Sequence, residues 1–451
     1  MRFIALAAII FSVPVFMVLL QQSAQYRRYL YFAVGLLPFI MSALNLDAAI
    51  ISWASWPGQS KGMIISLLDA LALAIVIRSR RSPLFFPFAA ILIAYICAAA
   101  LSIAFSNNPQ ASFFYVWQLS RMFLVFWAVA NICMVDDGPK MIISGLVCGV
   151  ALQAGFAINQ KLSGVVQASG TMGHQNLLGV ATHFALYPAL AMLMASKKAK
   201  LPILGVIAGL VAVSFGASRA TIGLAGIGVV LLILLSMARK PSARKTKVAI
   251  AGLVILAIAT PVAIASLQQR FTIQSTEGSN EERQAFNRAA RMIFADNPMG
   301  IGANQYVVIA NTKGYSEKAG VIWNRSSRTA PVHNSYLLVL AETGFVGLFC
   351  FILVLIVPIF MALRFAWQNR RDPRGDIALG YGVTLIIFAL HSFYEWIMLT
   401  WIIQYMLGIA LGLLAGLIMQ RKAIQRATLV ARRKERQKSE ANDTPALAKS
   451  S

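Results

Sequence analysis

One histidine occupies a position where it could do chemistry. His333, in Ala330-Pro331-Val332-His333-Asn334, ends a long polar segment and immediately precedes a long apolar one. An imidazole is neutral or charged near physiological pH, so it can accept a proton from a hydroxyl group. A single histidine at a helix start is more often a cap or a hydrogen-bonded residue, so its role depends on what gathers around it. His174 has a similar placement before another apolar run.

Arginines in the same polar segment suggest anion binding. Ser279 and Glu282 form a capping-box pattern, which predicts a helix from Ser279 to about Ala295. Arg283, Arg288 and Arg291 fall within it at spacings that let several side chains face one direction, toward a membrane surface. Clustered guanidinium groups suit a diphosphate, because each fork can contact two oxygens. The alternatives for any one of them are a solvated charge or a contact with lipid headgroups.

Arg219 stands between two apolar runs with almost no loop around it. A charge held at that depth is costly unless it meets a partner, or unless its side chain extends to the headgroups. Walker, zinc-binding, nucleophile-elbow and dinucleotide patterns do not occur in the sequence. Paired carboxylates that would hold a divalent metal are not evident in the outer loops. We therefore expect chemistry that needs no metal and no cofactor.

Composition identifies the surroundings of these residues. The chain has 451 residues, of which 58% are hydrophobic and only 12% charged, and a net charge of +24. That much apolar surface is stable where lipid is the solvent. The cations fit the basic cytoplasmic loops of membrane proteins, which also contact anionic membrane lipids, better than nucleic acid. The four cysteines lie in or beside apolar runs without metal-ligand spacing.

Hydropathy predicts an all-α polytopic membrane protein with about 12–13 transmembrane helices and one large loop that contains short helices. Residues 1–266 hold the N-terminal helices, 267–333 the loop, 334–419 the C-terminal helices, and 420–451 a basic tail that is partly disordered, from Ser439 to Ser451. The predicted spans are 3–20, 29–46, 61–78, 84–105, 115–134, 141–159, 176–196, 201–217, 220–238, 248–266, 334–363, 377–394 and 397–419.

The cations orient these spans. Basic clusters recur in alternate loops, which should therefore be cytoplasmic together with the tail. The segment 267–333 and the N-terminus then lie on the outer side. A structureless loop of that length is uncommon in a compact protein unless it is functional.

Several short motifs resemble the O-antigen ligase and polymerase superfamily. The first is the run 169–179, with His174 and Asn176, and the second is Ser218-Arg219-Ala220. Asp296-Asn297-Pro298 with Gly300 and Gly302 follows, and then come His333-Asn334-Ser335-Tyr336-Leu337 and Glu342-Thr343-Gly344. Together they cover roughly residues 165–365, in the family's order, around a large periplasmic loop.

The resemblance implies a glycosyltransferase of the bacterial inner membrane with its active site facing the periplasm. Such an enzyme moves a glycan from undecaprenyl diphosphate to an acceptor hydroxyl, on lipid A core or on a growing polysaccharide. It implies that His333 is the base and that Arg219 and Arg283, with Arg288 as a rival, bind the diphosphate. His174, Asn176, Asn334 and Tyr336 are possible accessory residues.

The competing interpretation is a transporter or flippase for polysaccharide or lipid-linked glycan. It requires charged residues in the centre of the bundle. Asp69, Arg121 and His183 lie in apolar surroundings and are the candidates for that role. The long loop with its arginines and its boundary histidine favours the enzyme.

Overall fold

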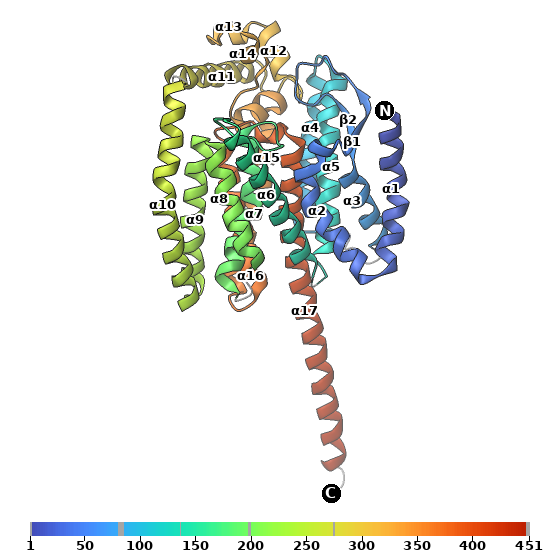
Figure 1. Cartoon of the computed structure of the whole chain (residues 1–451). Helices are drawn as coiled ribbons and strands as arrows, with labels where there is room; N and C mark the ends of the chain where they lie inside the picture. Colours follow the sequence, from blue (N-terminus) through green and yellow to red (C-terminus); the bar gives the residue numbers. More distant parts are fainter. Residues whose placement is uncertain (1, 80–84, 136, 197–199, 274–275, 448–451) are drawn as a thin grey trace.

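The computed structural model describes residues 2–79, 85–135, 137–196, 200–273 and 276–447 and shows a helical bundle with one small sheet (Figure 1). Eight of the described helices are long and apolar enough to cross a membrane, and two shorter apolar helices accompany them. The membrane-spanning part is thus all helical, and the protein is a polytopic membrane protein, as the sequence predicts.

The helices and strands follow one another along the chain as α1 (Arg2–Gln22), α2 (Ala24–Leu44), β1 (Asp47–Ser52), β2 (Gly62–Ser66), α3 (Leu67–Arg78), α4 (Ala89–Leu101), η1 (Ser102–Phe105), α5 (Pro109–Ile132), α6 (Gly138–Leu162), α7 (Gln175–Ala195), α8 (Lys200–Gly216), α9 (Arg219–Arg239), α10 (Ala243–Ile273), α11 (Thr276–Asp296), α12 (Tyr306–Thr312), α13 (Tyr315–Lys318), α14 (Arg325–Thr329), α15 (Ser335–Gln368), α16 (Pro373–His391), η2 (Ile397–Leu399) and α17 (Trp401–Leu447).

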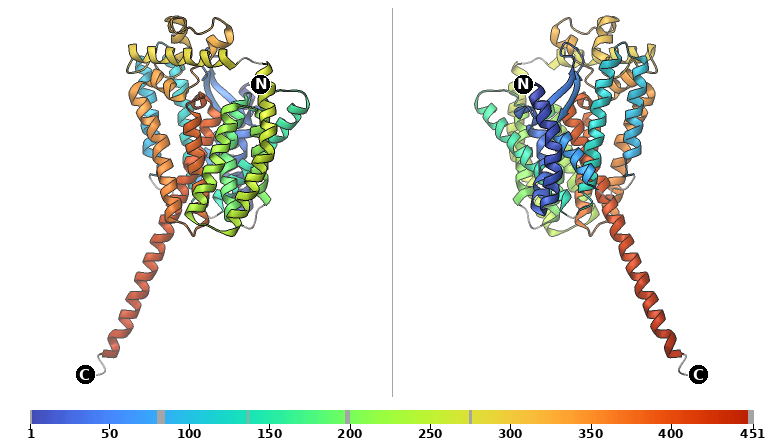
Figure 2. Two further views of the ribbon diagram at one scale, coloured as in Figure 1. Left: turned by 90° about the vertical axis from the view of Figure 1, so that its left-hand side faces the viewer. Right: turned by 90° about the vertical axis from the view of Figure 1, so that its right-hand side faces the viewer.

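The bundle has two distinct ends. Helices α11 to α14 cover one of them, which we call the loop end, and the N-terminus lies near it (Figure 1). Helix α17 leaves the bundle at the other, which we call the tail end, and projects far beyond it in every view (Figure 2). The sequence predicted a disordered end from Ser439, whereas α17 continues to Leu447, and residues 448–451 lie outside the described part of the chain.

Three further boundaries differ from the predicted ones. The predicted span 61–78 begins as a strand, since β2 pairs with β1 in an antiparallel hairpin before α3 starts. Ser66 ends the strand and caps α3 through a reciprocal capping box with Asp69. The helix in the large loop begins at Thr276, three residues before the predicted cap at Ser279, and α10 runs on to Ile273.

Glycine allows close packing between α17 and α5. Gly408, Gly412 and Gly416 follow one another at intervals of four along α17 and face α5. A Cβ added at Gly412 would lie 2.4 Å from the carbonyl oxygen of Phe126, and one at Gly416 would lie 2.6 Å from that of Ala130. Small residues at this spacing let two backbones approach closely, which is how helices associate in lipid, where the hydrophobic effect is weak.

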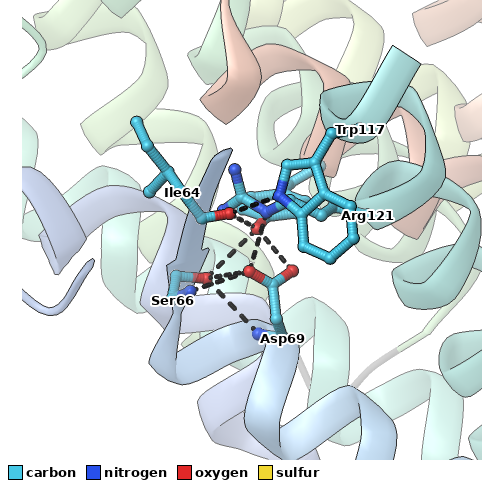
Figure 3. A network of polar contacts seen from close by, with 6 residues as sticks. Ile64, Ser66, Asp69, Trp117 and Arg121 are labelled. Carbon is cyan, nitrogen blue, oxygen red and sulfur yellow. Dashed lines mark hydrogen bonds and ion pairs between the residues drawn. The ribbon is translucent and has the colours of Figure 1, made fainter. Parts of the chain in front are cut away.

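A buried ion pair joins three helices near the hairpin. Arg121 of α5 donates from Nε to the carboxylate of Asp69 at 2.8 Å, and the Tyr405 hydroxyl of α17 donates to the same carboxylate at 2.5 Å. Ser66 adds its backbone N–H at 2.8 Å, and Figure 3 shows Ser66 and Arg121 beside Asp69. Asp69 and Arg121 therefore neutralise each other inside the bundle, and the transporter interpretation loses two of its three residues.

Candidate active site at the loop end

His333 lies at the loop end, just before the first residue of α15. Its imidazole is 23% exposed and lies beside the rings of Phe286, on α11, and Trp396, which follows α16. The aromatic rings shield it on two sides while the remaining exposure leaves a way in for another molecule. The structure therefore places a partly shielded imidazole where three elements converge.

Glu395 is the partner of this imidazole, and sequence reasoning missed it. Its Oε2 lies 3.3 Å from Nδ1 of His333, and its side chain is only 5% exposed. Glu395 lies beyond the end of α16, and its side chain contacts His333, Arg283 and Asn176. Only the meeting of α15 with the turn after α16 brings the pair together.

The backbone around Glu395 is fixed by Ser335. The Ser335 hydroxyl donates to the carbonyl oxygen of Glu395 at 2.6 Å, and its N–H donates to that of Ser392 at 2.7 Å. The first turn of α15, which begins two residues after His333, is thus bound to the segment that carries Glu395. A His–carboxylate pair held in this way has a defined orientation, because the carboxylate selects which ring nitrogen carries the hydrogen.

Helix α7 contributes a second contact to the carboxylate. Asn176, in the first turn of α7, is buried, and its side-chain amide donates to Oε1 of Glu395. His174 caps the same helix, since its Nδ1 accepts from the N–H of Asn176 at 3.2 Å. His174 therefore helps to place Asn176, and Asn176 reaches the carboxylate directly.

Arg283 extends this network onto α11. Its guanidinium lies 3.4 Å from Oε1 of Glu395, and 37% of its side chain is exposed. Burial by itself would raise the pKa of Glu395, but the hydrogen bond with His333 and the charges of His333 and Arg283 outweigh it and lower that pKa below its ordinary value. Glu395 is therefore held as a carboxylate, with a base on one side and a partly exposed cation on the other.

Arg288 and Arg219 occupy different positions. Arg288 donates from Nε and Nη2 to the carbonyl oxygen of Ala319, at 3.2 and 2.8 Å, so it braces the loop. Arg219 is the first residue of α9 and follows Ala217, whose positive φ of 46° makes the sharp turn from α8. Thr221, on the same turn of α9 as Arg219, packs against Gly179 of α7, so Arg219 lies at the loop end near the start of α7.

The remaining predicted residues support the start of α15. Asn334 is its N-cap, and its side-chain oxygen accepts from the N–H groups of Tyr336 and Leu337 at 3.0 and 3.1 Å. The Tyr336 hydroxyl donates to the carbonyl oxygen of Ala389 at 2.9 Å, and its ring packs on Phe393. These contacts tie α15 to α16 beside the His–carboxylate pair.

Two of the short motifs interlock below the loop. The turn at Gly300 and Gly302 enters a kink in α15 at Gly344, where φ is 66°. A Cβ on Gly344 would lie 2.5 Å from the carbonyl carbon of Met299, so the approach requires glycine. The buried carboxylate of Glu342 accepts from the N–H of Asn304 at 2.8 Å, which joins the loop to the kink. These motifs build the scaffold of the site.

The fold defines a multi-pass membrane protein whose polar centre lies under a helical loop at one end of the bundle. Residues 204–352 match the family model described as O-antigen ligase (Wzy_C), which confirms the predicted family resemblance over about a third of the chain. The matched range contains Arg219, Arg283, Arg288 and His333, whereas Asn176 and Glu395 lie outside it. The search of curated proteins finds no match.

Proposed function

We propose that the protein is a glycosyltransferase of the bacterial inner membrane that moves a glycan from undecaprenyl diphosphate to an acceptor hydroxyl. The observation that carries the proposal is the His333–Glu395 pair, joined by Arg283 and Asn176 from two further helices. The match to the O-antigen ligase family supports the class of donor. The basic last turns of α3 and α9, with Arg78 and Arg239, support a cytoplasmic tail and a periplasmic site.

His333 acts as the general base in this proposal. Glu395 accepts the hydrogen of Nδ1, which leaves the lone pair of Nε2 for the proton of the acceptor hydroxyl. The oxygen of that hydroxyl bonds to the anomeric carbon as the bond from this carbon to the diphosphate oxygen breaks. General-base catalysis of this kind accelerates a reaction by about 10²–10⁴-fold. The carboxylate then stabilises the imidazolium ion.

Arginine stabilises the leaving group. Departure of undecaprenyl diphosphate leaves negative charge on its oxygens, and guanidinium groups aimed at that charge act without a metal. Arg283 and Arg219 take this role, with Arg283 changing its partner from Glu395 to the diphosphate. The partial exposure of Arg283 supports this exchange, because its guanidinium is accessible to a ligand that approaches from solvent. Attack from the face opposite the diphosphate would invert the anomeric centre.

The acceptor distinguishes two activities of the same chemistry. Transfer to lipid A core would make the protein an O-antigen ligase, and transfer to a growing chain would make it a polymerase of O-antigen or exopolysaccharide. Arg288 is less suited than Arg283 to bind the diphosphate, because its guanidinium already donates to the carbonyl oxygen of Ala319.

The experiment is transfer in vitro with purified full-length protein in lipid nanodiscs. The donor is a defined undecaprenyl-diphosphate glycan, and the acceptors are lipid A core and the unextended repeat unit, each with and without chelator. Wild type should form product in the presence of chelator, and His333→Ala should lose about 10²–10⁴-fold in rate. Lys313→Ala, which removes an exposed cation from the same end, is the matched control. An active His333→Ala protein would refute the proposed base, and loss of product with chelator would refute the metal-free mechanism.

A further inference from the structure

A pocket on the outward face of α11 lies beside the proposed active site and has a different chemical character. It encloses about 240 Å³ and is lined by Glu281, Glu282, Gln284, Arg288, Gly320 and Ile322. Glu281, Gln284 and Arg288 are spaced three and four apart and are all exposed, so they share one face of the helix. Arg283, which contacts Glu395, lies between two of these lining residues in the sequence.

The lining suits hydroxyl groups better than phosphate. Two carboxylates face one guanidinium, so the pocket has no excess positive charge for a phosphate. Carboxylate and amide oxygens accept hydrogen bonds, while the Gln284 amide and the Arg288 guanidinium donate them, and a sugar hydroxyl can do both. Oε1 of Glu282 is buried and has no hydrogen-bond partner among the described residues. A buried carboxylate oxygen without a donor is costly, and a ligand hydroxyl would satisfy it.

An exposed tryptophan stands at the rim of this pocket. Trp323 follows the lining residue Ile322 directly, and its side chain is 80% exposed. The guanidinium carbon of Arg328 lies 4.2 Å from the centre of the indole ring, and Arg328 is itself anchored to the carbonyl oxygen of Val321 at 3.1 Å. Arg328 therefore contacts the ring, most of which stays exposed. A large exposed aromatic beside a polar pocket is typical of a binding surface.

The position of Trp323 argues against a lipid contact. It immediately precedes Asn324, the N-cap of α14, and Figure 1 shows α14 above α11 on the side away from the bundle. Aromatic residues that anchor a protein in the membrane lie at the headgroup level, where the bundle meets the loop. The Trp323 ring is thus available to a soluble ligand on the outer side.

We propose that this pocket and Trp323 form a glycan subsite, in which the indole stacks on the apolar face of a sugar ring while Glu281, Glu282 and Gln284 bind its hydroxyls. The inference rests on the proposed function for its biological meaning. The diphosphate end of the donor lies at Arg283, and the uncharged part of a glycan crosses α11 into the pocket. The subsite selects for sugars beyond the one at the reacting carbon.

The test measures glycan binding apart from transfer. Full-length protein in nanodiscs, free of sugar-based detergent, is incubated with an array of neutral bacterial oligosaccharides of two to six sugars. Wild type should bind a subset, and Trp323→Ala should lose about three- to tenfold in affinity, as expected for removal of a stacking aromatic. Trp323→Phe should restore most of the binding. Glu317→Gln, an exposed carboxylate on α13 outside the pocket, should bind as wild type does.

The transfer assay separates this inference from the proposed function. If wild type transfers glycan and Trp323→Ala raises KM for long but not for short donors, both are supported. If wild type binds oligosaccharides, Trp323→Ala binds them more weakly, and wild type transfers no glycan, the subsite is supported and the proposed function is refuted. The subsite would be overturned if wild type, Trp323→Ala and a Glu281→Gln/Glu282→Gln variant bound the oligosaccharides equally well. It would also be overturned if wild type transferred glycan but bound no oligosaccharide on the array. Unchanged thermal unfolding of Trp323→Ala confirms that its fold is intact.

Discussion

Substitution of Glu395 by glutamine tests whether the buried carboxylate acts through His333. Glutamine keeps the size of the side chain and can still accept from Asn176, but it removes the negative charge that faces the imidazole at 3.3 Å. Loss of a partner that orients a histidine typically costs about 10–100-fold in activity. We therefore expect kcat to fall by about 10–100-fold, which corresponds to about 1.4–2.7 kcal/mol in the activation barrier.

The double variant decides between positioning and an independent role. If Glu395 acts only through the imidazole, His333→Ala/Glu395→Gln should be no slower than His333→Ala alone. Initial rates of glycan transfer, measured at saturating donor and acceptor, provide the comparison. Two results would refute the reasoning: a Glu395→Gln enzyme with the wild-type rate, or a double variant whose loss equals the product of the two single losses. A raised KM for the donor would show that Glu395 also positions Arg283.

The pH dependence of stability gives a second measurement on the same residue. The folded protein lowers the pKa of Glu395 below its ordinary value of 4.5. The carboxylate of Glu395 therefore contributes its full stabilisation at pH values above its pKa in the unfolded chain. This stabilisation is lost as the pH falls through its lower pKa in the folded protein. The melting temperature of wild type should exceed that of Glu395→Gln at pH 7, and the difference should shrink below pH 4. A difference that is constant from pH 7 to pH 3 would contradict the assignment.

Three other predictions test further parts of the structure. Arg283→Lys should raise KM for the lipid-linked donor, because the lysine ammonium lacks the planar fork with which arginine contacts two oxygens. Arg288→Lys should mainly lower the melting temperature. Equal effects of the two variants on KM would contradict the assignment of Arg283 to the diphosphate. Gly344→Ala should destabilise the fold by about 1–3 kcal/mol, since its positive φ and close contact exclude a Cβ, and an unchanged melting temperature would argue against the kink. Asp376→Asn breaks the buried ion pair with Arg239 and should lower the free energy of unfolding by about 3–5 kcal/mol. Asp137→Asn breaks the exposed pair with Arg28 and should lower it by about 0–1 kcal/mol, measured for both variants by chemical denaturation.

Sequence alone determined the class of the protein and predicted the face of the membrane at which its chemistry would occur. Apolar runs of about 20 residues leave few alternatives to membrane helices, because every backbone polar group must be paired in lipid. The excess of cations in alternate loops predicted that 267–333 is the exceptional outer segment, and its boundary histidine predicted the centre of the candidate site. These are local signals, since each depends on residues that are neighbours along the chain.

Tertiary structure decided the contacts that make a site from these residues. Glu395 follows an apolar run 62 positions after His333, and nothing in its neighbourhood predicts that it meets the imidazole. Arg283 contacts Glu395 whereas Arg288 contacts Ala319, and this difference depends on how α11 is rotated about its axis against the bundle. The sequence of α11 alone does not specify that rotation. The β1–β2 hairpin escaped prediction because its second strand continues without a break into an apolar helix. Spacing along the chain limits which residues can share a helix face, but only packing between helices determines which faces meet.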